Sequence, residues 1–372
     1  EQAPDVIAYV DPKFKMPQVW RSNLNVDIQL PYDFMLSVGA MYTRDIYNVA
    51  QINMNEAEPT GVYNEQPDRI YWASKKYEYN DYTNGKNVVV KLSNGEDKGY
   101  QYSFNAILTK KYDFGFTGSI GYTYTMAKDL TANPGSAPNS AWQNNVAVNS
   151  LNDPGVSYSL FSTPHRIIAN ASYEINYAKC LKTTFSLFYS GYHTGRYSYT
   201  YYNDMNGDGN YSDLIYVPNS QDEMTFVDIT DKSGAITYSA VDQAKDFWDF
   251  VNNDSYLKDR KGKYVERNGS LTPWINRFDF KIAQDFYATL GGRKYGIQVS
   301  LDMLNVGNMI NSKWGAYQSC GLKSYDNVQL LKTASKVGEP LTYQINANSR
   351  EAFKERSSWQ YTNTIGLSLI HI

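Results

Sequence analysis

The chain has 372 residues, enough for a large core, and a formal net charge of −3, which gives no indication of a nucleic-acid partner. Hydrophobic residues make up 42% of it, yet no run approaches the roughly 20 apolar residues that a membrane-spanning helix needs. The two cysteines, Cys180 and Cys320, are too few for a disulfide framework and are interpreted as lone residues. The 34 tyrosines fit either the aromatic girdles of a membrane barrel or a glycan-binding surface.

The first predicted strand runs from Trp20 to Tyr32, after a proline-rich approach over residues 11–17. Nearly every second side chain in it is apolar, and the positions between them carry Arg, Asn, Asp and Gln. This alternation predicts a strand with one apolar and one polar face. Its residues, at about 3.3 Å each and tilted about 45°, give a height of about 28 Å, close to the apolar band of an outer membrane.

Further strands with the same alternation follow the turn at Tyr32-Asp33. The clearest pair lies in Asn276–Asn305, where two arms meet at a Gly291-Gly292-Arg293-Lys294 turn and the first arm is expected to slip in register near Ala283 to Asp285. The predicted strands after the first cover residues 34–43, 100–109, 114–125, 165–175, 183–199, 278–286 and 295–303, and a last one runs from Trp359 to the chain end.

The connections between these strands alternate strictly between short turns and long polar segments. The long segments are expected over residues 45–98, 129–163, 201–270 and 307–357. Outer-membrane barrels alternate in this way because their periplasmic turns are short and their outer loops are long. A soluble sandwich has no reason to segregate loop length to one end. The pattern therefore predicts an all-β protein, a transmembrane antiparallel β-barrel.

The predicted strands number nine, and single-chain bacterial barrels have an even number. An open sheet edge in lipid would leave backbone polar groups without hydrogen-bond partners. We therefore expect residues 1–372 to be the C-terminal part of one larger barrel domain, with earlier strands and any plug domain upstream of Glu1.

Six motifs are spread along the chain. They are Asp11-Pro12-Lys13-Phe14-Lys15-Met16-Pro17-Gln18-Val19-Trp20-Arg21-Ser22-Asn23, Tyr122-Thr123-Tyr124-Thr125-Met126-Ala127-Lys128-Asp129, Ser162-Thr163-Pro164-His165-Arg166, Asn206-Gly207-Asp208-Gly209-Asn210-Tyr211-Ser212-Asp213-Leu214-Ile215-Tyr216-Val217-Pro218, Pro273-Trp274-Ile275-Asn276-Arg277-Phe278-Asp279 and Asp302-Met303-Leu304-Asn305-Val306-Gly307-Asn308. These motifs resemble the C-terminal barrel of TonB-dependent outer-membrane receptors, most closely the Oar-like receptors of Bacteroidetes-type bacteria. The resemblance covers nearly the whole chain. It implies a barrel of 22 strands with a plugged lumen, located in the bacterial outer membrane and energised by the TonB complex through the N-terminal part. The SusC-like branch, which works with a surface lipoprotein, stays open as the receptor type.

One stretch has the spacing of a calcium-binding loop. Asp204, Asn206, Asp208 and Asn210 place oxygen ligands at every second position, with Gly207 and Gly209 between them. The acidic residue expected at the twelfth position is replaced by Ile215, and Asp213 is the substitute ligand. A metal-free turn rich in Asp and Asn is the alternative. Calcium is the one cofactor that the sequence suggests.

An amphipathic helix is predicted over Ser239–Asn253, with a serine N-cap. Its simplest role is to pack the third long loop, and the alternative is a lid or ligand contact through its aromatic side chains. We take the following aromatic residues of the long loops as ligand candidates: Trp72, Trp142, Phe247, Trp248 and Phe250.

Charged residues recur on the polar face of the predicted strands. They would line the barrel lumen, either as salt bridges along its wall or as contacts for a passing solute. The residues are Asp27, Arg166, Glu174, Arg277, Asp279 and Lys281. The three histidines, His165, His193 and His371, are scattered without a recognised Ser or Cys partner, so an enzyme is not expected.

Three functions remain open at this point. The first is a TonB-dependent receptor that binds a solute at its outer loops and imports it. The second is a structural or adhesive outer-membrane barrel without active transport. The third is a soluble β protein that binds glycans through its aromatic residues.

Overall fold

A computed structural model describes residues 6–79, 88–178, 180–316, 318–320, 323–324, 327–346, 359–361 and 369–371. Strands account for 50% of the residues and helices for 10%, which confirms the all-β class. Among the described residues, no helix combines the length and the apolar character needed to cross a membrane.

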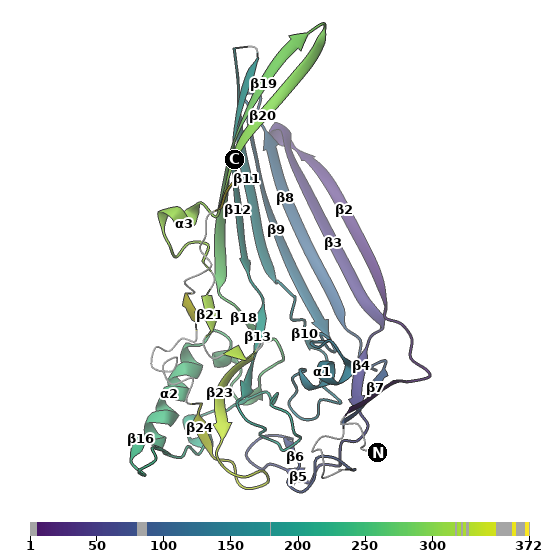
Figure 1. Ribbon diagram of the computed structural model, residues 1–372, viewed down its shortest axis with the longest axis vertical. Coiled ribbons are helices and arrows are strands. Elements are labelled where there is room, and N and C mark those ends of the chain that lie inside the picture. Colours follow the sequence, from purple (N-terminus) through teal and green to yellow (C-terminus); the bar gives the residue numbers. More distant parts are fainter. Residues whose placement is uncertain are drawn as a thin grey trace.

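The principal sheet of the described residues has ten strands, and nine of them, which we call the wall, follow one another in chain order, each antiparallel to its neighbours. The tenth, β10 (Ser157–Tyr158), pairs only with the end of β9. All wall strands but the last have 12 to 17 residues, about twice the usual length in soluble proteins. Figure 1 shows them running nearly side by side along the long axis. They are β2 (Gln18–Leu30), β3 (Phe34–Tyr47), β8 (Tyr100–Lys111), β9 (Phe116–Asp129), β11 (His165–Tyr177), β12 (Leu181–His193), β19 (Trp274–Leu290), β20 (Arg293–Leu304) and β26 (Leu369–His371).

The wall is an open sheet over the described residues. At one edge β2 pairs only with β3, and at the other edge β26 pairs only with β20. Of the predicted ninth strand, Leu369–His371 lies in the wall, whereas β25 (Trp359–Tyr361) pairs with β21 (Gln318–Cys320) in a separate two-stranded sheet. Residues 362–368 and Ile372 lie outside the described residues.

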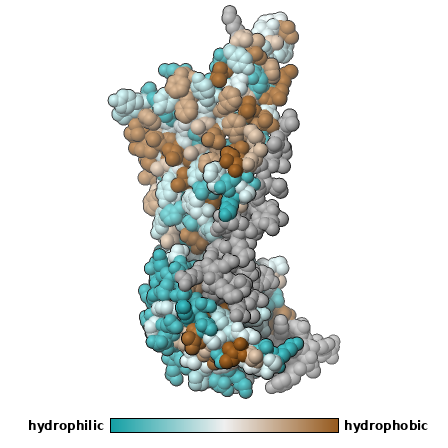
Figure 2. Space-filling model, turned by 90° about the vertical axis from the view of Figure 1, so that its left-hand side faces the viewer, coloured by the Kyte–Doolittle hydropathy of each residue, from teal (hydrophilic) through white to brown (hydrophobic). Residues whose placement is uncertain are grey.

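The register of the wall brings apolar side chains together on one face. A cross-strand row on this face runs through Ile28, Leu36, Leu108, Ile120, Ala169, Tyr189 and Phe278. Large members of the same face are open to the surroundings, with Leu24 68% and Ile120 55% exposed. Figure 2 shows brown side chains gathered over the wall and a mostly teal surface at the other end of the molecule.

The turns at one end of the wall are short. The last one is a tight turn whose two residues, Gly291 and Gly292, have φ of 58° and 76°, a conformation that glycine adopts without a Cβ penalty. The β2–β3 turn is the 3-10 segment η1 (Pro31–Asp33), as expected at Tyr32-Asp33. The predicted register slip near Ala283 to Asp285 is wrong, because β19 pairs continuously with both β12 and β20 through these residues.

The opposite ends of the wall strands are joined by four long segments, which together with residues 6–10 we call the loop layer (residues 6–10, 48–99, 130–164, 194–273 and 305–346). The predicted alternation of short and long connections is thus present. The predicted strand over residues 183–199 is divided. β12 ends at His193, and β13 (Arg196–Tyr201) leaves the wall to pair with β18 (Ser270–Leu271) and β23 (Asn327–Thr333).

The elements of the loop layer are mostly short. The first segment holds β4 (Ala50–Asn53), β5 (Gly61–Val62), β6 (Ile70–Tyr71) and β7 (Val88–Ser93), and β7 also pairs in parallel with β1 (Val6–Val10). The second holds α1 (Pro138–Gln143) and β10 (Ser157–Tyr158), which pairs with the end of β9. The third holds β13, β14 (Tyr216–Val217), η2 (Gln221–Glu223), β15 (Ile229–Thr230), β16 (Ile236–Tyr238), α2 (Ala240–Asn253), η3 (Leu257–Asp259), β17 (Lys263–Tyr264) and β18 (Ser270–Leu271). The fourth holds α3 (Gly307–Ile310), β21, β22 (Lys323–Ser324), β23 (Asn327–Thr333) and β24 (Tyr343–Ile345).

The loop layer has a hydrophobic core of its own. All six residues of β13 are buried, and Tyr199 and Tyr201 have no exposed surface. The predicted helix is confirmed as α2, whose N-cap Ser239 accepts a hydrogen bond through Oγ from the backbone N–H of Asp242 at 3.1 Å. Burial of these apolar side chains provides the main stabilisation of this end of the molecule.

Candidate functional site

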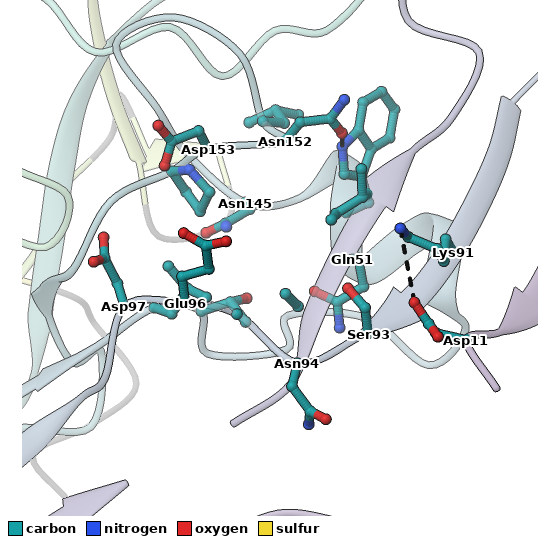
Figure 3. A pocket seen from close by; sticks show the side chains of 18 residues that line it. Asp11, Gln51, Lys91, Ser93, Asn94, Glu96, Asp97, Asn145, Asn152 and Asp153 are labelled. Carbon is teal, nitrogen blue, oxygen red and sulfur yellow. Dashed lines mark hydrogen bonds and ion pairs between the residues drawn. The ribbon is translucent and has the colours of Figure 1, made fainter. Parts of the chain in front are cut away.

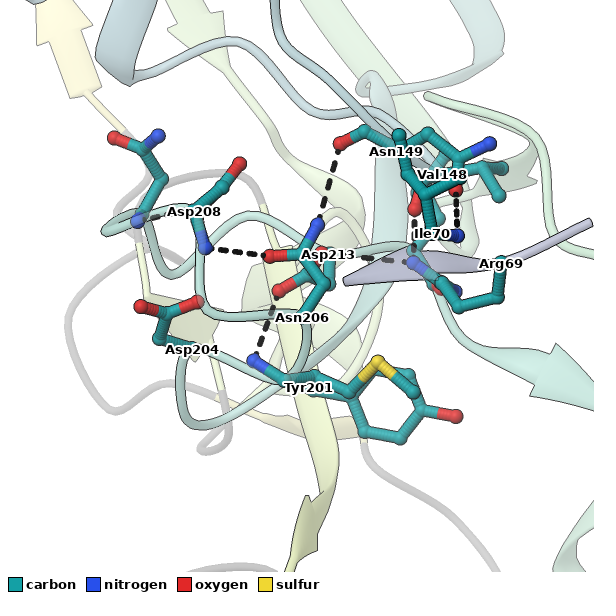
Figure 4. Close-up of polar contacts among 12 residues, drawn as sticks. Arg69, Ile70, Val148, Asn149, Tyr201, Asp204, Asn206, Asp208 and Asp213 are labelled. Carbon is teal, nitrogen blue, oxygen red and sulfur yellow. Dashed lines mark hydrogen bonds and ion pairs between the residues drawn. The ribbon is translucent and has the colours of Figure 1, made fainter. Parts of the chain in front are cut away.

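The predicted calcium loop forms a tight turn inside the loop layer (Figure 4). The two carboxylate oxygens of Asp204 accept hydrogen bonds from the backbone N–H groups of Gly207 and Gly209, at 2.8 and 2.9 Å. Asn206 Oδ1 accepts from the N–H of Asp208 at 3.0 Å, and Asp208 Oδ1 accepts from the N–H of Asn210 at 2.7 Å. Each side chain thus holds the backbone two to five residues further on, which is how short polar side chains fix a turn.

Three carboxyl groups of this loop are held close together in a low-dielectric environment. Burial, the repulsion of Asp204 and the opposing attraction of Arg69 leave the pKa of Asp213 raised to about 7. Burial and the charges of Asp213 and Asp204 raise the pKa of Asp208 well above its usual range. Burial likewise raises the pKa of Asp204, against the hydrogen bonds from Gly207 and Gly209. The loop therefore carries more negative charge than its surroundings stabilise, and a cation beside it would relieve that repulsion.

Arg69 is the counter-ion that the structure supplies. Its side chain is fully buried, and its guanidinium lies 3.5 Å from Asp213 Oδ1. It also donates hydrogen bonds to the carbonyl oxygens of Val148 and Leu214 and to Gln66 Oε1. No sequence pattern singles out this residue, because Gln66-Pro67-Asp68-Arg69 lies in a polar stretch with no periodicity that marks burial.

The same arginine connects three of the long segments. Its guanidinium carbon lies 4.8 Å from the ring centroid of Tyr264, and Gln66 Nε2 donates to the hydroxyls of Tyr201 and Tyr343 at 2.9 and 2.8 Å. Since these partners come from different connections between wall strands, the network fixes the segments relative to one another.

The residues that could hold calcium are the predicted ones, through carboxylate oxygens of Asp204, Asp208 and Asp213 and the amide oxygens of Asn206 and Asn210. In this structure backbone N–H groups already donate to side-chain oxygens of Asp204, Asn206, Asp208 and Asp213. Within the described ranges no group of three or more His, Cys, Asp or Glu side chains has a geometry that could hold a metal ion. Calcium binding stays a prediction with a direct test.

Four of the five aromatic ligand candidates are core residues. Trp72, Trp142, Phe247 and Phe250 are 4%, 2%, 1% and 1% exposed, so their rings offer almost no surface to a solute. The two tryptophans donate through Nε1 to Ala57 O and to Asn152 Oδ1. The ligand role predicted for these four residues is corrected to packing, because the loop layer needs large side chains to fill its interior.

Trp248 differs from the other four aromatics. It is only partly buried, and the ammonium group of Lys261 lies 4.5 Å from its ring centroid. This cation–π contact covers one face of the ring.

The six charged residues predicted for the lumen all lie on the polar face of the wall. The register places Asp27 and Arg277 in one cross-strand row and Arg166 in the row beside it. Arg277 Nε donates to Asp279 Oδ1 at 3.0 Å, and Lys281 forms a 3.0 Å ion pair with its cross-strand neighbour Asp302. Sequence alternation was enough to assign this face.

Two further residues of the set, Asp27 and Glu174, also have polar partners. Asp27 Oδ1 accepts a hydrogen bond from Ser37 Oγ at 2.5 Å. Glu174 lies 3.5 Å from Lys182 Nζ, which pairs with Asp285 at 3.1 Å. The polar face thus consists of linked charges of both signs, an arrangement suited to a wet surface.

No family model, no curated protein and no solved structure matches the chain. The functional argument therefore rests on the geometry of the wall and of the loop layer.

Proposed function

We propose that the chain is the C-terminal part of the barrel of a TonB-dependent outer-membrane receptor, which binds a solute at its loop layer and imports it when the TonB complex acts on a plug domain. The observation that carries this proposal is the wall itself. Its strands are long, antiparallel and in chain order, and its exposed face is apolar along continuous cross-strand rows. A lipid environment accounts for such a face, since apolar patches of this extent are rare on soluble proteins.

The loop layer accounts for solute binding in this proposal. Its four segments meet at one end of the wall, as the outer loops of such barrels do, and Arg69 and its partners hold them in a fixed arrangement. The polar face of the wall, with its linked charges, would form part of the lumen. The protein then contributes binding and a gated path, and the energy for import comes from the inner membrane.

The open edges of the wall agree with a larger barrel. The unpaired edge of β2 presents backbone donors and acceptors that lipid cannot satisfy, so the proposal requires further strands beside it. A surface lipoprotein partner, as in the SusC-like branch, is compatible with the same arrangement.

The test of this proposal is the intact mass of the native protein extracted from outer membranes, together with its N-terminal peptides. We expect a species well above 42.4 kDa that carries a plug domain ahead of these strands. A native protein of 42.4 kDa, or one recovered only from soluble fractions, would contradict the proposal.

A barrel with a structural or adhesive role is the second candidate function. The observation in its favour is the packed core of the loop layer, which gives the long segments a firm surface of the kind that adhesion uses. Deletion of the TonB system separates the two: uptake of the solute stops in the first case, and binding to the cell surface is unchanged in the second.

A further inference from the structure

A pocket of about 510 Å³ opens in the loop layer beside β4, β7 and α1 (Figure 3). Strand β7 contributes Lys91 and Ser93 to its lining, and the turn after β7 contributes Glu96 and Asp97. Asp153 approaches from the second long segment. The volume is within the range of ordinary ligand sites.

Negative charge dominates one side of this pocket. Glu96, Asp97 and Asp153 are all exposed, and Figure 3 shows their carboxylates gathered at the same side. In the described part of the chain none of the three forms an ion pair. The pocket's lysine, Lys91, lies at the opposite side and is already 3.8 Å from Asp11.

A buried hydroxyl group on the Lys91 side of the pocket has no hydrogen-bond partner in the described part of the chain (Figure 3). Ser93 is 7% exposed, and its Oγ forms no hydrogen bond to any described residue. A buried polar atom without a partner is destabilising, so such atoms are rare in proteins and often mark the place of a missing group. Ser93 lines the pocket, so a ligand's N–H group placed there would satisfy its oxygen.

The acidic side continues into a second cavity. Asp97, Asp153 and Pro154 also line a neighbouring cavity of about 900 Å³, which extends toward β17. Asp97 and Asp153 therefore face both spaces, whereas Glu96 faces only the first.

We propose that this pocket binds a short basic peptide, with a lysine ammonium or arginine guanidinium group held by Glu96, Asp97 and Asp153 and a ligand N–H donating to Ser93 Oγ. Charge-assisted hydrogen bonds to carboxylates are among the strongest in proteins. A neutral glycan fits less well, because Trp142 is 2% exposed and cannot stack against a sugar ring. The inference deepens the proposed function, since it names the class of solute that the loop layer would capture.

The experiment measures equilibrium binding of fluorescein-labelled trilysine to the purified full-length protein. Triglutamate and maltotriose are the comparison ligands. We expect only trilysine to bind, and an increase of NaCl from 50 to 500 mM to weaken it about tenfold, because salt screens exposed charges. Equal binding of trilysine and maltotriose would overturn the inference, as would binding that salt leaves unchanged.

Two triple variants test the assignment of the site. The variant Glu96→Gln, Asp97→Asn, Asp153→Asn should weaken trilysine binding at least about tenfold. The variant Glu339→Gln, Asp222→Asn, Asp113→Asn removes the same charge from exposed positions that do not line the pocket, and it should change the affinity less than about twofold. Similar losses in both variants would mean that net charge alone attracts the peptide, and the site would be wrong.

A single substitution tests the hydroxyl group. Ser93→Ala should weaken trilysine binding about threefold without lowering the thermal midpoint, because the hydroxyl has no described partner to lose. Unchanged affinity would remove Ser93 from the site. Uptake by intact cells with and without the TonB system is measured separately, so that a failure of transport is distinguished from a failure of peptide binding.

Discussion

The wall and the loop layer of this molecule place their apolar side chains in opposite ways. In the wall, Leu24, Phe104 and Ile120 are more than half exposed on a continuous face. In the loop layer, Phe247, Phe250 and Leu330 are 1% exposed or less. The comparison teaches that the loop layer buries its apolar side chains in a core of its own, whereas the wall leaves one apolar face uncovered, as expected for the lipid-facing barrel proposed above. Four predictions test this contrast.

The largest loss of stability is expected from a substitution in the loop layer. Arg69→Met leaves the buried Asp213 carboxyl without its counter-ion, and we expect the free energy of unfolding to fall by about 3–5 kcal/mol. Urea denaturation followed by tyrosine fluorescence measures it. Arg166→Met, in the wall, is the control: its side chain is exposed, and its guanidinium lies 5.8 Å from the ring centroid of Tyr192. We expect it to change stability by less than about 1 kcal/mol. Equal losses of unfolding free energy in the two variants would show that Arg69 contributes no special stabilisation to the loop layer.

The second effect tests the apolar face of the wall. Phe104 and Ser103 are neighbours on β8 and lie on opposite faces at the same depth. An arginine on a lipid-exposed face near the membrane midplane costs about 2–4 kcal/mol, and one in a polar lumen costs little. We therefore expect Phe104→Arg to lower the stability in lipid vesicles by this amount and Ser103→Arg to lower it far less. The reverse order would assign the lipid to the other face.

The third effect concerns calcium at the Asp204–Asp213 loop. With a dissociation constant of about 1 mM, typical of extracellular calcium modules, 10 mM CaCl₂ would stabilise the protein by about 1.4 kcal/mol. We expect this gain to disappear in Asp208→Asn and to be absent with MgCl₂. Isothermal titration that detects no heat with millimolar Ca²⁺ would reject the calcium site.

The smallest effect is the contribution of Glu56 to the pH dependence of the protein's stability. Burial raises the pKa of Glu56 above 4.5, against hydrogen bonds from Ser150 and Asn152. The folded state then binds the proton more tightly than the unfolded state, so this contribution to stability is complete below pH 4.5 and is lost as the pH rises through the folded pKa. Glu56→Gln should make the decline shallower in pH-dependent urea denaturation, and the exposed Glu339→Gln should not. An unchanged slope in Glu56→Gln would assign the dependence to other groups.

The wall could be predicted from the sequence because its signal is local. Two-residue alternation assigned Asp27, Arg277 and Lys281 to one face, and the register confirms that they share it. The error was the slip near Ala283 to Asp285. A slip there would move Gln284 to the polar face, whereas Gln284 stays on the apolar face and accepts hydrogen bonds from the Tyr177 and Thr183 hydroxyls.

The loop layer could be predicted only in part. The helix α2 has a cap and a period that the sequence displays, so its position was found. The partners of Arg69 come from residues 66, 148, 213 and 264, and no local pattern predicts contacts between such distant positions. For the same reason the sequence does not show that Trp72 and Trp142, which it suggests as ligand candidates, fill the interior. The parallel pairs of β1 with β7 and of β13 with β23 were likewise not expected.

The most direct test of the account is the accessibility of single spin labels along β8 in lipid vesicles. Cys180 and Cys320 are first replaced by serine, and one cysteine at a time is placed over residues 101–108. We predict that oxygen, which concentrates in lipid, relaxes labels at residues 102, 104, 106 and 108 most strongly, and that a water-soluble nickel complex favours the residues between them. Labels without this two-residue period, or with both faces equally open to the nickel complex, would contradict the assignment of the wall to a membrane.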